Sequence, residues 1–313
     1  MTDSPPHAVR LPPAGAAAEL ARFLSPDTLV RTNEPLARRT TLRVGGPADL
    51  YIEPASEEDL AAVVRFCSDH ALPRFVLGRG SNLLVKDEGY RGVVLCLAHP
   101  CFSRLEFEGQ QVYCGAGARL KNIALEAKRQ GVAGLEFLEG IPGSLGGALR
   151  MNAGAMGSAT FEVVLAVRLM DGNGRVLELA PKELGVAYRS CGALRDQIAL
   201  GATLRGREDA REEIEKRMQQ FNAKRWQSQP AAPSAGCIFK NPLPVPAGRL
   251  IDELGLKGTR VGGAMVSFEH GNFLVNDGTA TARDFLELIE LIRARARAER
   301  GIELETEVQI VGE

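Results

Sequence analysis

Hydrophobic residues recur with the spacing of a helix in four segments of the chain. In residues 57–70, one face carries Leu60, Val63, Val64 and Cys67, a period that predicts a helix. Ser56 and Asp59 stand where an approximate capping box would begin it. Helices are also predicted over 120–129, 207–225 and 282–300. The segment 207–225 is charged and amphipathic, and its apolar face carries Ile214, Met218 and Phe221.

Short runs that are apolar or alternate in polarity predict strands between these helices. Residues 51–97 should form strand, helix, strand, turn and strand, with a short buried strand at 74–77. Residues 163–170 and 176–179 flank the turn sequence Asp-Gly-Asn-Gly, so they should pair as a hairpin. This mixture of elements predicts an α+β fold.

The C-terminal run 303–311 alternates in polarity, as a strand with one solvated face does. Leu304, Thr306, Val308 and Ile310 fall on one face, and Glu303, Glu305, Glu307 and Gln309 fall on the other. On this pattern alone, Glu307 belongs to a solvated face.

A shift in composition near Gly206 divides the chain. We predict a flexible, proline-rich tail over residues 1–24, a first domain over 25–206 and a smaller α/β domain over 207–313. The first domain should contain two lobes, about 25–106 and 107–206, because 313 residues exceed what one minimal core needs.

Composition and charge exclude several classes of protein. The chain has 45% hydrophobic and 25% charged residues, as globular proteins do, and its net charge of −1 gives no overall attraction to nucleic acid or anionic membranes. Its six cysteines lack metal-ligand or disulfide spacing, which suggests a reducing cytoplasm and no metal site. No apolar run is long enough to cross a membrane, and the N-terminus lacks the apolar core of an export signal.

Glycine-rich loops are the main indication of a bound ligand. The loop of Gly78, Arg79, Gly80, Ser81 and Asn82 follows an apolar strand and could bring backbone N–H groups to an anion, although alone it could be a plain turn. A weaker signal is the pair Gly115 and Gly117. Residues 141–157 hold five glycines in a loop that is costly to order without a ligand, though a structural role is the alternative. Together the loops favour a long ligand with two phosphates, such as a dinucleotide.

Three separated side chains suggest chemistry on a carboxylate-bearing substrate that must receive a proton. Cys237 lies in the sequence Gly-Cys-Ile-Phe-Lys-Asn-Pro, Arg189 follows a strand-like run, and Glu307 lies near the C-terminus. An arginine fork holds a carboxylate and stays charged. Each residue also has a plainer interpretation: Cys237 as a small buried hydrophobe, Arg189 as part of a surface turn, and Glu307 as a solvated charge.

Eight short segments, in order, resemble the UDP-N-acetylenolpyruvoylglucosamine reductase (MurB) family in its shorter, second type. They lie at 41–48, 77–82, 134–143, 151–155, 188–190, 236–242, 260–264 and 307–308. The resemblance implies a two-lobed FAD-binding domain of the vanillyl-alcohol-oxidase (PCMH) type, over 25–206, followed by a smaller α/β substrate-binding domain that ends in a catalytic strand. It also implies a cytoplasmic enzyme of peptidoglycan synthesis, and hence of cell-wall biogenesis, cell shape and cell division.

The resemblance also implies the reaction and the residues of the site. NADPH would reduce FAD, which would reduce UDP-N-acetylglucosamine enolpyruvate to UDP-N-acetylmuramate. Catalysis would fall to Arg189, Cys237 and Glu307, and substrate binding to Tyr188, Arg225, Asn241 and Lys257. FAD would be held by Gly78, Arg79, Gly80, Ser81, Asn82, Gly115, Gly117, Ile141, Pro142, Gly143, Ser144, Gly146, Gly147, Asn152 and Gly154.

One departure from the family concerns Cys237, because the family usually has serine there as the proton donor. A thiol is a stronger acid than an alcohol, so the role is chemically possible, but a thiol near Arg189 could ionise and donate poorly. No histidine lies in the glycine loops, so FAD should be bound non-covalently. Other FAD-dependent oxidases on this scaffold, or a non-catalytic UDP-sugar-binding protein, are the alternatives. No obligate protein partner is implied.

Overall fold

The first lobe is built on a four-stranded sheet with the order β1-β2-β5-β3. A computed structural model describes residues 12–313 of the chain. Strands β2 (Pro47–Glu53), β5 (Tyr90–Cys96) and β3 (Arg74–Leu77) run parallel, while β1 (Leu29–Pro35) pairs antiparallel with β2. Helix α2 (Glu57–Asp69) connects β2 to β3, and its N-cap is the predicted Ser56, whose side chain accepts a hydrogen bond from the N–H of Asp59.

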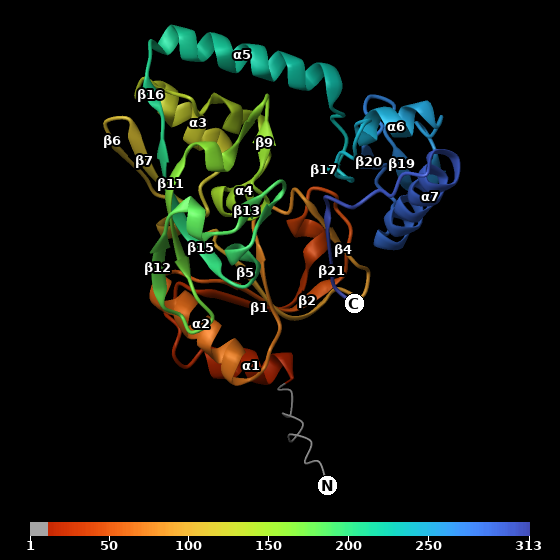
Figure 1. The fold of residues 1–313 in the computed structure, drawn as a ribbon. Coiled ribbons are helices and arrows are strands. Elements are labelled where there is room, and N and C mark those ends of the chain that lie inside the picture. Colours follow the sequence, from red (N-terminus) through yellow and green to blue (C-terminus); the bar gives the residue numbers. More distant parts are fainter. Residues whose placement is uncertain (1–11) are drawn as a thin grey trace.

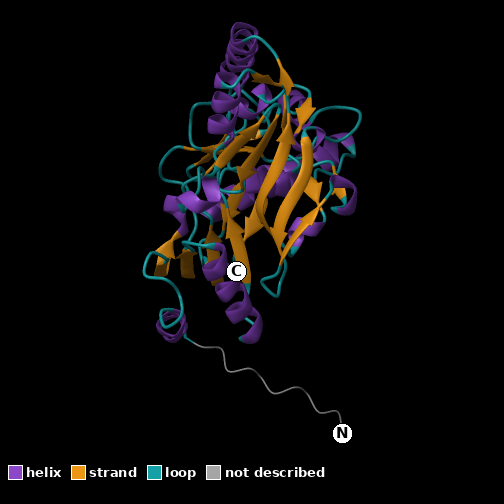
Figure 2. Ribbon diagram, turned by 90° about the vertical axis from the view of Figure 1, so that its left-hand side faces the viewer, coloured by secondary structure: helices purple, strands orange, loops and turns teal. Residues whose placement is uncertain are grey.

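The second lobe is a five-stranded antiparallel sheet with the order β12-β11-β15-β7-β6. Its strands are β6 (Leu105–Glu108), β7 (Gln111–Gly115), β11 (Val164–Met170), β12 (Val176–Leu179) and β15 (Ile198–Arg205), with helices α3 (Leu120–Arg129) and α4 (Leu145–Met151). The predicted hairpin is confirmed by the pairing of β11 with β12. One hydrophobic core joins this sheet to α2 of the first lobe. Figure 2 shows the strands side by side with helices around them.

The third unit is a small sheet with the order β17-β20-β19-β18, accompanied by two helices. Its elements are β17 (Ser234–Cys237), α6 (Ala247–Glu253), β18 (Arg260–Val261), β19 (Ala264–Val266), β20 (Phe273–Asn276) and α7 (Ala282–Arg300). Thr281 and Asp284 form a capping box on α7, and Asp87 of the first lobe accepts bonds from the N–H groups of Ala282 and Arg283. The first lobe therefore helps to cap a helix of the third unit.

The C-terminal segment returns to the first lobe. Strand β21 (Gln309–Val311) pairs in parallel with β4 (Leu83–Val85), and Figure 1 shows the two side by side. The predicted strand 303–311 is thus shorter than expected. Leu304 and Val308 are buried as the alternation predicts, whereas Ile310 is 37% exposed.

Short antiparallel pairs complete the fold. They are β8 (Val132–Ala133) with β16 (Arg207–Glu208), β9 (Gly154–Ala155) with β10 (Ser158–Ala159), and β13 (Val186–Ala187) with β14 (Ser190–Cys191).

The prediction of a flexible tail over residues 1–24 is wrong where the structure describes it. Residues 1–11 of that tail lie outside the described part, but Pro13–Leu20 form helix α1. Ala16 and Leu20 are almost fully buried and belong to the large core, to which α2 residues such as Val63 also belong. We predicted no helix here because the segment is rich in proline. Pro13, however, occupies the first turn of the helix, where a missing N–H costs nothing.

Helix α5 (Arg211–Ser228) packs on the first two lobes. We predicted instead that residues 207–225 belong to the C-terminal domain. Ile214 and Met218 belong to the large core of the first two lobes, and Arg217 forms an ion pair with Glu136. Figure 1 shows α5 above α3. No residue between Leu84 and Ala235 belongs to the core of the third unit. The chain therefore passes from the large core to the core of the third unit after α5, and not near Gly206.

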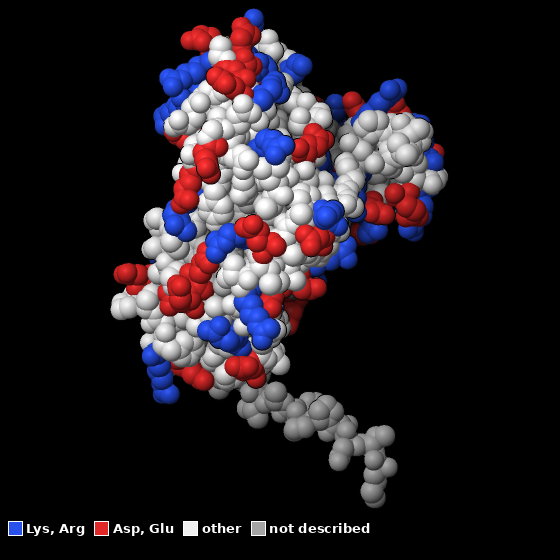
Figure 3. Space-filling view, turned by 60° about the vertical axis from the view of Figure 1, so that its left-hand side comes forward, with Lys and Arg blue, Asp and Glu red and all other residues white. Residues whose placement is uncertain are grey.

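Three features of the described residues concern membrane-spanning helices, metal sites and disulfide bonds. No helix among residues 12–313 is long and apolar enough to cross a membrane, and no cluster of potential metal ligands is found there. All six cysteines are free. On the face drawn in Figure 3, acidic and basic side chains are interspersed.

We predict that Leu20→Ala destabilises the protein by about 2–5 kcal/mol, because removing a fully buried leucine would leave a cavity in the large core beside α1. Leu243→Ala is the control, since Leu243 is 93% exposed and should change stability little. Urea unfolding of both variants measures the difference. Equal stability of the two would mean that α1 does not contribute to the folded core.

Candidate active site

A single large groove, of about 1470 Å³, collects most of the predicted site residues. All three units contribute to its walls. The predicted residues that line it are Gly78, Arg79, Gly80, Ser81, Asn82, Gly117, Ile141, Pro142, Gly143, Ser144, Gly146, Gly147, Gly154, Arg189, Arg225, Cys237 and Glu307. Glycine-rich loops and catalytic candidates that are far apart in sequence therefore share one cavity.

The glycine loops present bare backbone to this groove. Gly80 has φ +63°, and a Cβ there would collide with the carbonyl of Arg39, so only glycine fits. At Gly140 a Cβ would meet no atom within 4 Å, and at Gly147 its nearest neighbour would be the Ser144 hydroxyl at 3.9 Å. A side chain at either position would therefore extend into open space and narrow the groove. The hydroxyl of Ser81 donates to the carbonyl of Pro142 at 2.6 Å, which ties two of the loops together.

The charge of the groove fits an anionic ligand. Arg43, Arg79 and Arg119 line it, and their side chains make no ion pair or hydrogen bond with other residues in the range 12–313. Such cations are the expected partners of phosphate groups. The bare backbone and these arginines fit a ligand with a diphosphate, as FAD has. Of these three arginines only Arg79 was predicted as a site residue, because Arg43 and Arg119 lie outside the glycine loops and isolated arginines carry no positional signal.

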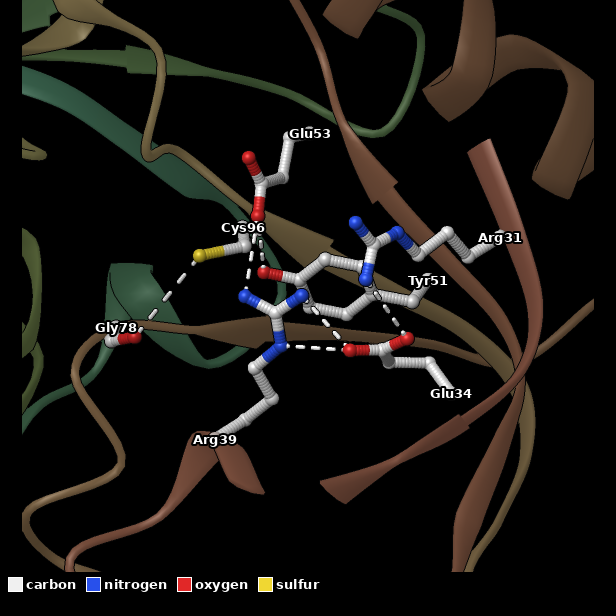
Figure 4. A network of polar contacts seen from close by, with 7 residues as sticks. All are labelled: Arg31, Glu34, Arg39, Tyr51, Glu53, Gly78 and Cys96. Atoms are coloured by element: carbon white, nitrogen blue, oxygen red, sulfur yellow. Dashed lines mark hydrogen bonds and ion pairs between the residues drawn. The ribbon is translucent and has the colours of Figure 1, made fainter. Parts of the chain in front are cut away.

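A network of polar side chains lies beside the loop that begins at Gly78 (Figure 4). The thiol of Cys96 links the two, because it donates to the carbonyl of Gly78. Arg39 lies over the ring of Tyr51 at 4.4 Å and pairs with Glu34 at 2.7 Å and with Glu53 at 3.4 Å. Tyr51 is fully buried and donates its hydroxyl proton to Glu53 at 2.7 Å. Burial and the neighbouring Cys96 raise the pKa of Tyr51, so the phenol stays protonated. Sequence analysis missed this network, which depends on contacts between strands.

The first catalytic candidate, Arg189, lies in the turn between β13 and β14, with a left-handed φ of +55°. Its Nε lies 2.8 Å from Oε1 of Glu307 as an ion pair, without the linear N–H geometry of a hydrogen bond. Its guanidinium also lies over the ring of Tyr188, 4.9 Å from the centroid. Asn152 holds this hairpin in place, since its amide donates to the carbonyl of Ala187 at 3.2 Å.

Backbone bonds on both sides fix the position of Glu307. Its N–H donates to the carbonyl of Ile238 at 2.7 Å, and its carbonyl accepts from the amide of Asn82 at 3.1 Å. The side chain is only 16% exposed, so the solvated face that alternation predicted is wrong at this residue. Burial raises the pKa of the Glu307 carboxyl, and the nearby Arg189 opposes that rise.

Cys237 ends β17 and lines the same groove. Burial and the negative charge of Glu307 raise the pKa of the thiol to about 12, against the smaller opposing effect of Arg189. The thiol is therefore protonated at neutral pH, and the concern that Arg189 would ionise it is not borne out. Asn272, which the sequence analysis missed, is buried and anchors the next residues through two bonds with the backbone of Phe239, at 2.9 and 2.7 Å.

Five predicted site residues do not line the groove: Gly115, Asn152, Tyr188, Asn241 and Lys257. A Cβ at Gly115 would collide with the backbone of Phe102, so this glycine permits packing. Asn241 accepts a bond from the N–H of Ala247 at 3.1 Å, and Lys257 pairs with Asp252 at 2.8 Å. Asn152 and Tyr188 contact the hairpin of Arg189, so their contribution to the groove is indirect.

The fold and groove define an oxidoreductase of the FAD-binding class. Residues 48–180 match the family described as "FAD binding domain", and residues 229–311 match "UDP-N-acetylenolpyruvoylglucosamine reductase, C-terminal domain". The predicted α+β fold, with its two-lobed FAD-binding domain and a smaller second domain, is confirmed, as is FAD as cofactor.

Known relatives then identify the particular family. The chain is 44% identical over 286 residues to the UDP-N-acetylenolpyruvoylglucosamine reductase of Bacillus velezensis, covering 90% of this chain and 94% of the relative. It is 45% identical to that of Heliobacterium modesticaldum, covering 90% of each. The crystal structure of the Thermus caldophilus reductase (MurB) matches with a TM-score of 0.79 and 40% identity, over 91% of this chain and 99% of that one. The chain belongs to the UDP-N-acetylenolpyruvoylglucosamine reductase family.

We predict that Cys237 reacts with iodoacetamide roughly 10³-fold more slowly in the folded protein than in the urea-unfolded chain at neutral pH. The reason is that a pKa of about 12 leaves little thiolate to react. Glu307→Gln should speed the reaction, because it removes the negative charge that raises this pKa. Peptide mass spectrometry measures the labelling of Cys237, and equal rates in folded and unfolded chains would contradict the raised pKa.

Proposed function

We propose that the chain reduces UDP-N-acetylglucosamine enolpyruvate to UDP-N-acetylmuramate with electrons from NADPH, with Arg189, Glu307 and Cys237 as its catalytic residues. The observation that carries this proposal is the presence of all three side chains in the groove of the glycine loops. FAD, which the glycine loops would hold, would supply the hydride-transfer chemistry between NADPH and the vinyl methylene carbon of the substrate. The residues of this chain bind the substrate, stabilise charge and supply the proton.

Arg189 is proposed to bind the carboxylate of the enolpyruvyl group. Hydride addition leaves negative charge on the carbon beside that carboxylate, and the charge spreads into it. A guanidinium that already faces the groove stabilises charge at the place where it develops. Its position supports this role, because Glu307, Tyr188 and the Asn152-bound hairpin hold it without occupying its outer nitrogens.

Glu307 is proposed to act as a hydrogen-bond partner of the same charge. In the substrate-free groove Glu307 is a carboxylate paired with Arg189; once the substrate carboxylate takes over Arg189, the pKa of Glu307, which burial raises, favours uptake of a proton. A protonated carboxyl can donate a hydrogen bond to an enolate oxygen, which an ionised one cannot.

Cys237 is proposed to deliver the proton that completes the reduction. The thiol S–H bond breaks, the proton joins the carbon next to the carboxylate, and the thiolate is later reprotonated from solvent. Its high pKa keeps the proton available at neutral pH. A general acid must begin the step in its protonated form.

FAD is proposed to be bound non-covalently, and Arg225 to contact the substrate diphosphate. His70, His99 and His270 all lie outside the residues that line the groove. Arg225 lines it, whereas Asn241 and Lys257 stay predictions without a place in it. A cytoplasmic location is also proposed, because free cysteines are typical of reducing compartments.

Arg189→Lys should slow reoxidation of the reduced flavin by substrate much more than reduction of the flavin by NADPH. Lysine keeps the charge but loses the planar fork that binds a carboxylate at two points. Stopped-flow absorbance of the flavin separates the two half reactions. Equal loss in both would show that Arg189 serves the structure of the groove and not the substrate.

Cys237→Ala should leave flavin reduction nearly intact and slow reoxidation by roughly 10²- to 10⁴-fold, the usual contribution of a positioned acid. Cys237→Ser should recover much of the rate, because a hydroxyl can hold a proton in the same place. With a thiol pKa of about 12, the native enzyme should show no loss of donor activity as pH rises through the neutral range. Native reoxidation rates in the alanine variant would mean that another group or water supplies the proton.

A further inference from the structure

Trp226, the one tryptophan in the sequence, lines the groove and has no role in the chemistry described above. It lies in the last turn of α5 and is 64% exposed. The apolar face of α5 runs through Ile214, Met218 and Phe221, which pack on the large core. Trp226 follows Phe221 by five residues, so it projects from a different side of the helix. Packing of α5 therefore does not explain this large exposed ring.

The helix end that carries Trp226 is fixed against the glycine loops. Arg225 donates from Nη1 to the carbonyl of Gly140 at 2.8 Å and from Nε to Oε1 of Gln229 at 3.1 Å. Burial lowers the pKa of Arg225, in keeping with a guanidinium partly withdrawn from water. The neighbouring Trp226 is thus presented to the groove from an anchored turn.

A nearly continuous wall connects Trp226 to the catalytic thiol. After Trp226, the groove is lined by Gln229 and by every residue from Pro230 to Cys237. The proposed reaction requires the enolpyruvyl group to lie at Cys237, and the base lies at the other end of a nucleotide sugar. A substrate that extends along this wall brings its diphosphate towards Arg225 and its base towards Trp226.

We propose that Trp226 is the stacking platform for the uracil base of the substrate, an assignment that rests on the proposed function. A tryptophan face stacks on a planar base, and it does so without needing hydrogen bonds to the base edge. Asn241, predicted to bind the substrate at its uracil or its sugar, does not line the groove, and its side-chain oxygen accepts a hydrogen bond from the N–H of Ala247. Trp226, which lines the groove, is therefore better placed than Asn241 to contact the base.

Because no other tryptophan is present, the emission of Trp226 reports directly on this site. The FAD-bound enzyme is titrated with UMP, with inorganic pyrophosphate and with NADP⁺. Saturable quenching by UMP, with none by pyrophosphate, supports the proposal. Equal quenching by pyrophosphate would show that the ring senses phosphate binding in general. Quenching by NADP⁺ alone would assign the ring to the other nucleotide. Either result overturns the uracil platform.

Kinetics of variants supply the second arm of the test. Trp226→Ala should raise the KM for the nucleotide-sugar substrate roughly 5- to 150-fold, the range expected for loss of one stacked base, with little change in kcat. Trp226→Phe should retain most of the affinity. Phe268→Ala is the matched control, because Phe268 is an aromatic residue 66% exposed and outside the groove lining. An unchanged KM in Trp226→Ala would overturn the proposal.

The two hypotheses fail in different ways. Flavin reduction by NADPH and its reoxidation by saturating substrate test the proposed function, and neither depends on Trp226. If both half reactions occur but Trp226→Ala has a native KM, only the stacking role is wrong. If substrate does not reoxidise the flavin in the native enzyme, the proposed function itself fails.

Discussion

The geometry of the active groove depends on the backbone of the C-terminal segment, which is bonded on two sides where it passes Glu307. Its N–H groups at residues 307 and 309 donate to the carbonyls of Ile238 and Asn82. One bond reaches the segment that follows Cys237, and the other reaches the glycine loop of residues 78–82. These two bonds place the Glu307 carboxyl beside Arg189 and in the electrostatic range of Cys237. Strand β21 then extends the contact by pairing with β4.

This arrangement couples the charges of the three catalytic candidates. Glu307 is buried enough that desolvation raises its pKa, and Arg189 at 2.8 Å limits that rise. The same carboxylate raises the pKa of Cys237, whereas Arg189 lowers it by a smaller effect than burial exerts. Arg189 is thus partly balanced by Glu307 before any substrate carboxylate arrives. The balance lets the Arg189 guanidinium stand near the Cys237 thiol without ionising it.

Much of the fold could be predicted from the spacing of hydrophobic residues, because a helix or strand with one buried face repeats them at a regular interval. The helices at 120–129 and 282–300 have the predicted bounds, and the hairpin of β11 and β12 follows from its turn sequence. Glu307 could not be placed this way, because its burial comes from segments some 70 and 225 residues away in the chain. Val76 illustrates the same limit: a short apolar run suggested a buried strand, but this side chain is 39% exposed and lines the groove. The resemblance to the family, and not local pattern, made Glu307 and Arg189 catalytic candidates.

The replacement of the family's serine by Cys237 is a substitution that this site can accommodate. A thiol in a polar, cationic pocket would lose its proton near neutral pH and fail as an acid. Here Cys237 ends β17, and both its burial and the negative charge of the nearby Glu307 favour the protonated form of the thiol. The backbone after residue 237 is anchored without any bond from the residue 237 side chain. The side chain of Asn272 binds the backbone of Phe239, and the N–H of Ile238 donates to the carbonyl of Asn272. Serine or cysteine would therefore be presented from the same backbone position, and what distinguishes the two acids is the electrostatic environment set by Glu307 and Arg189.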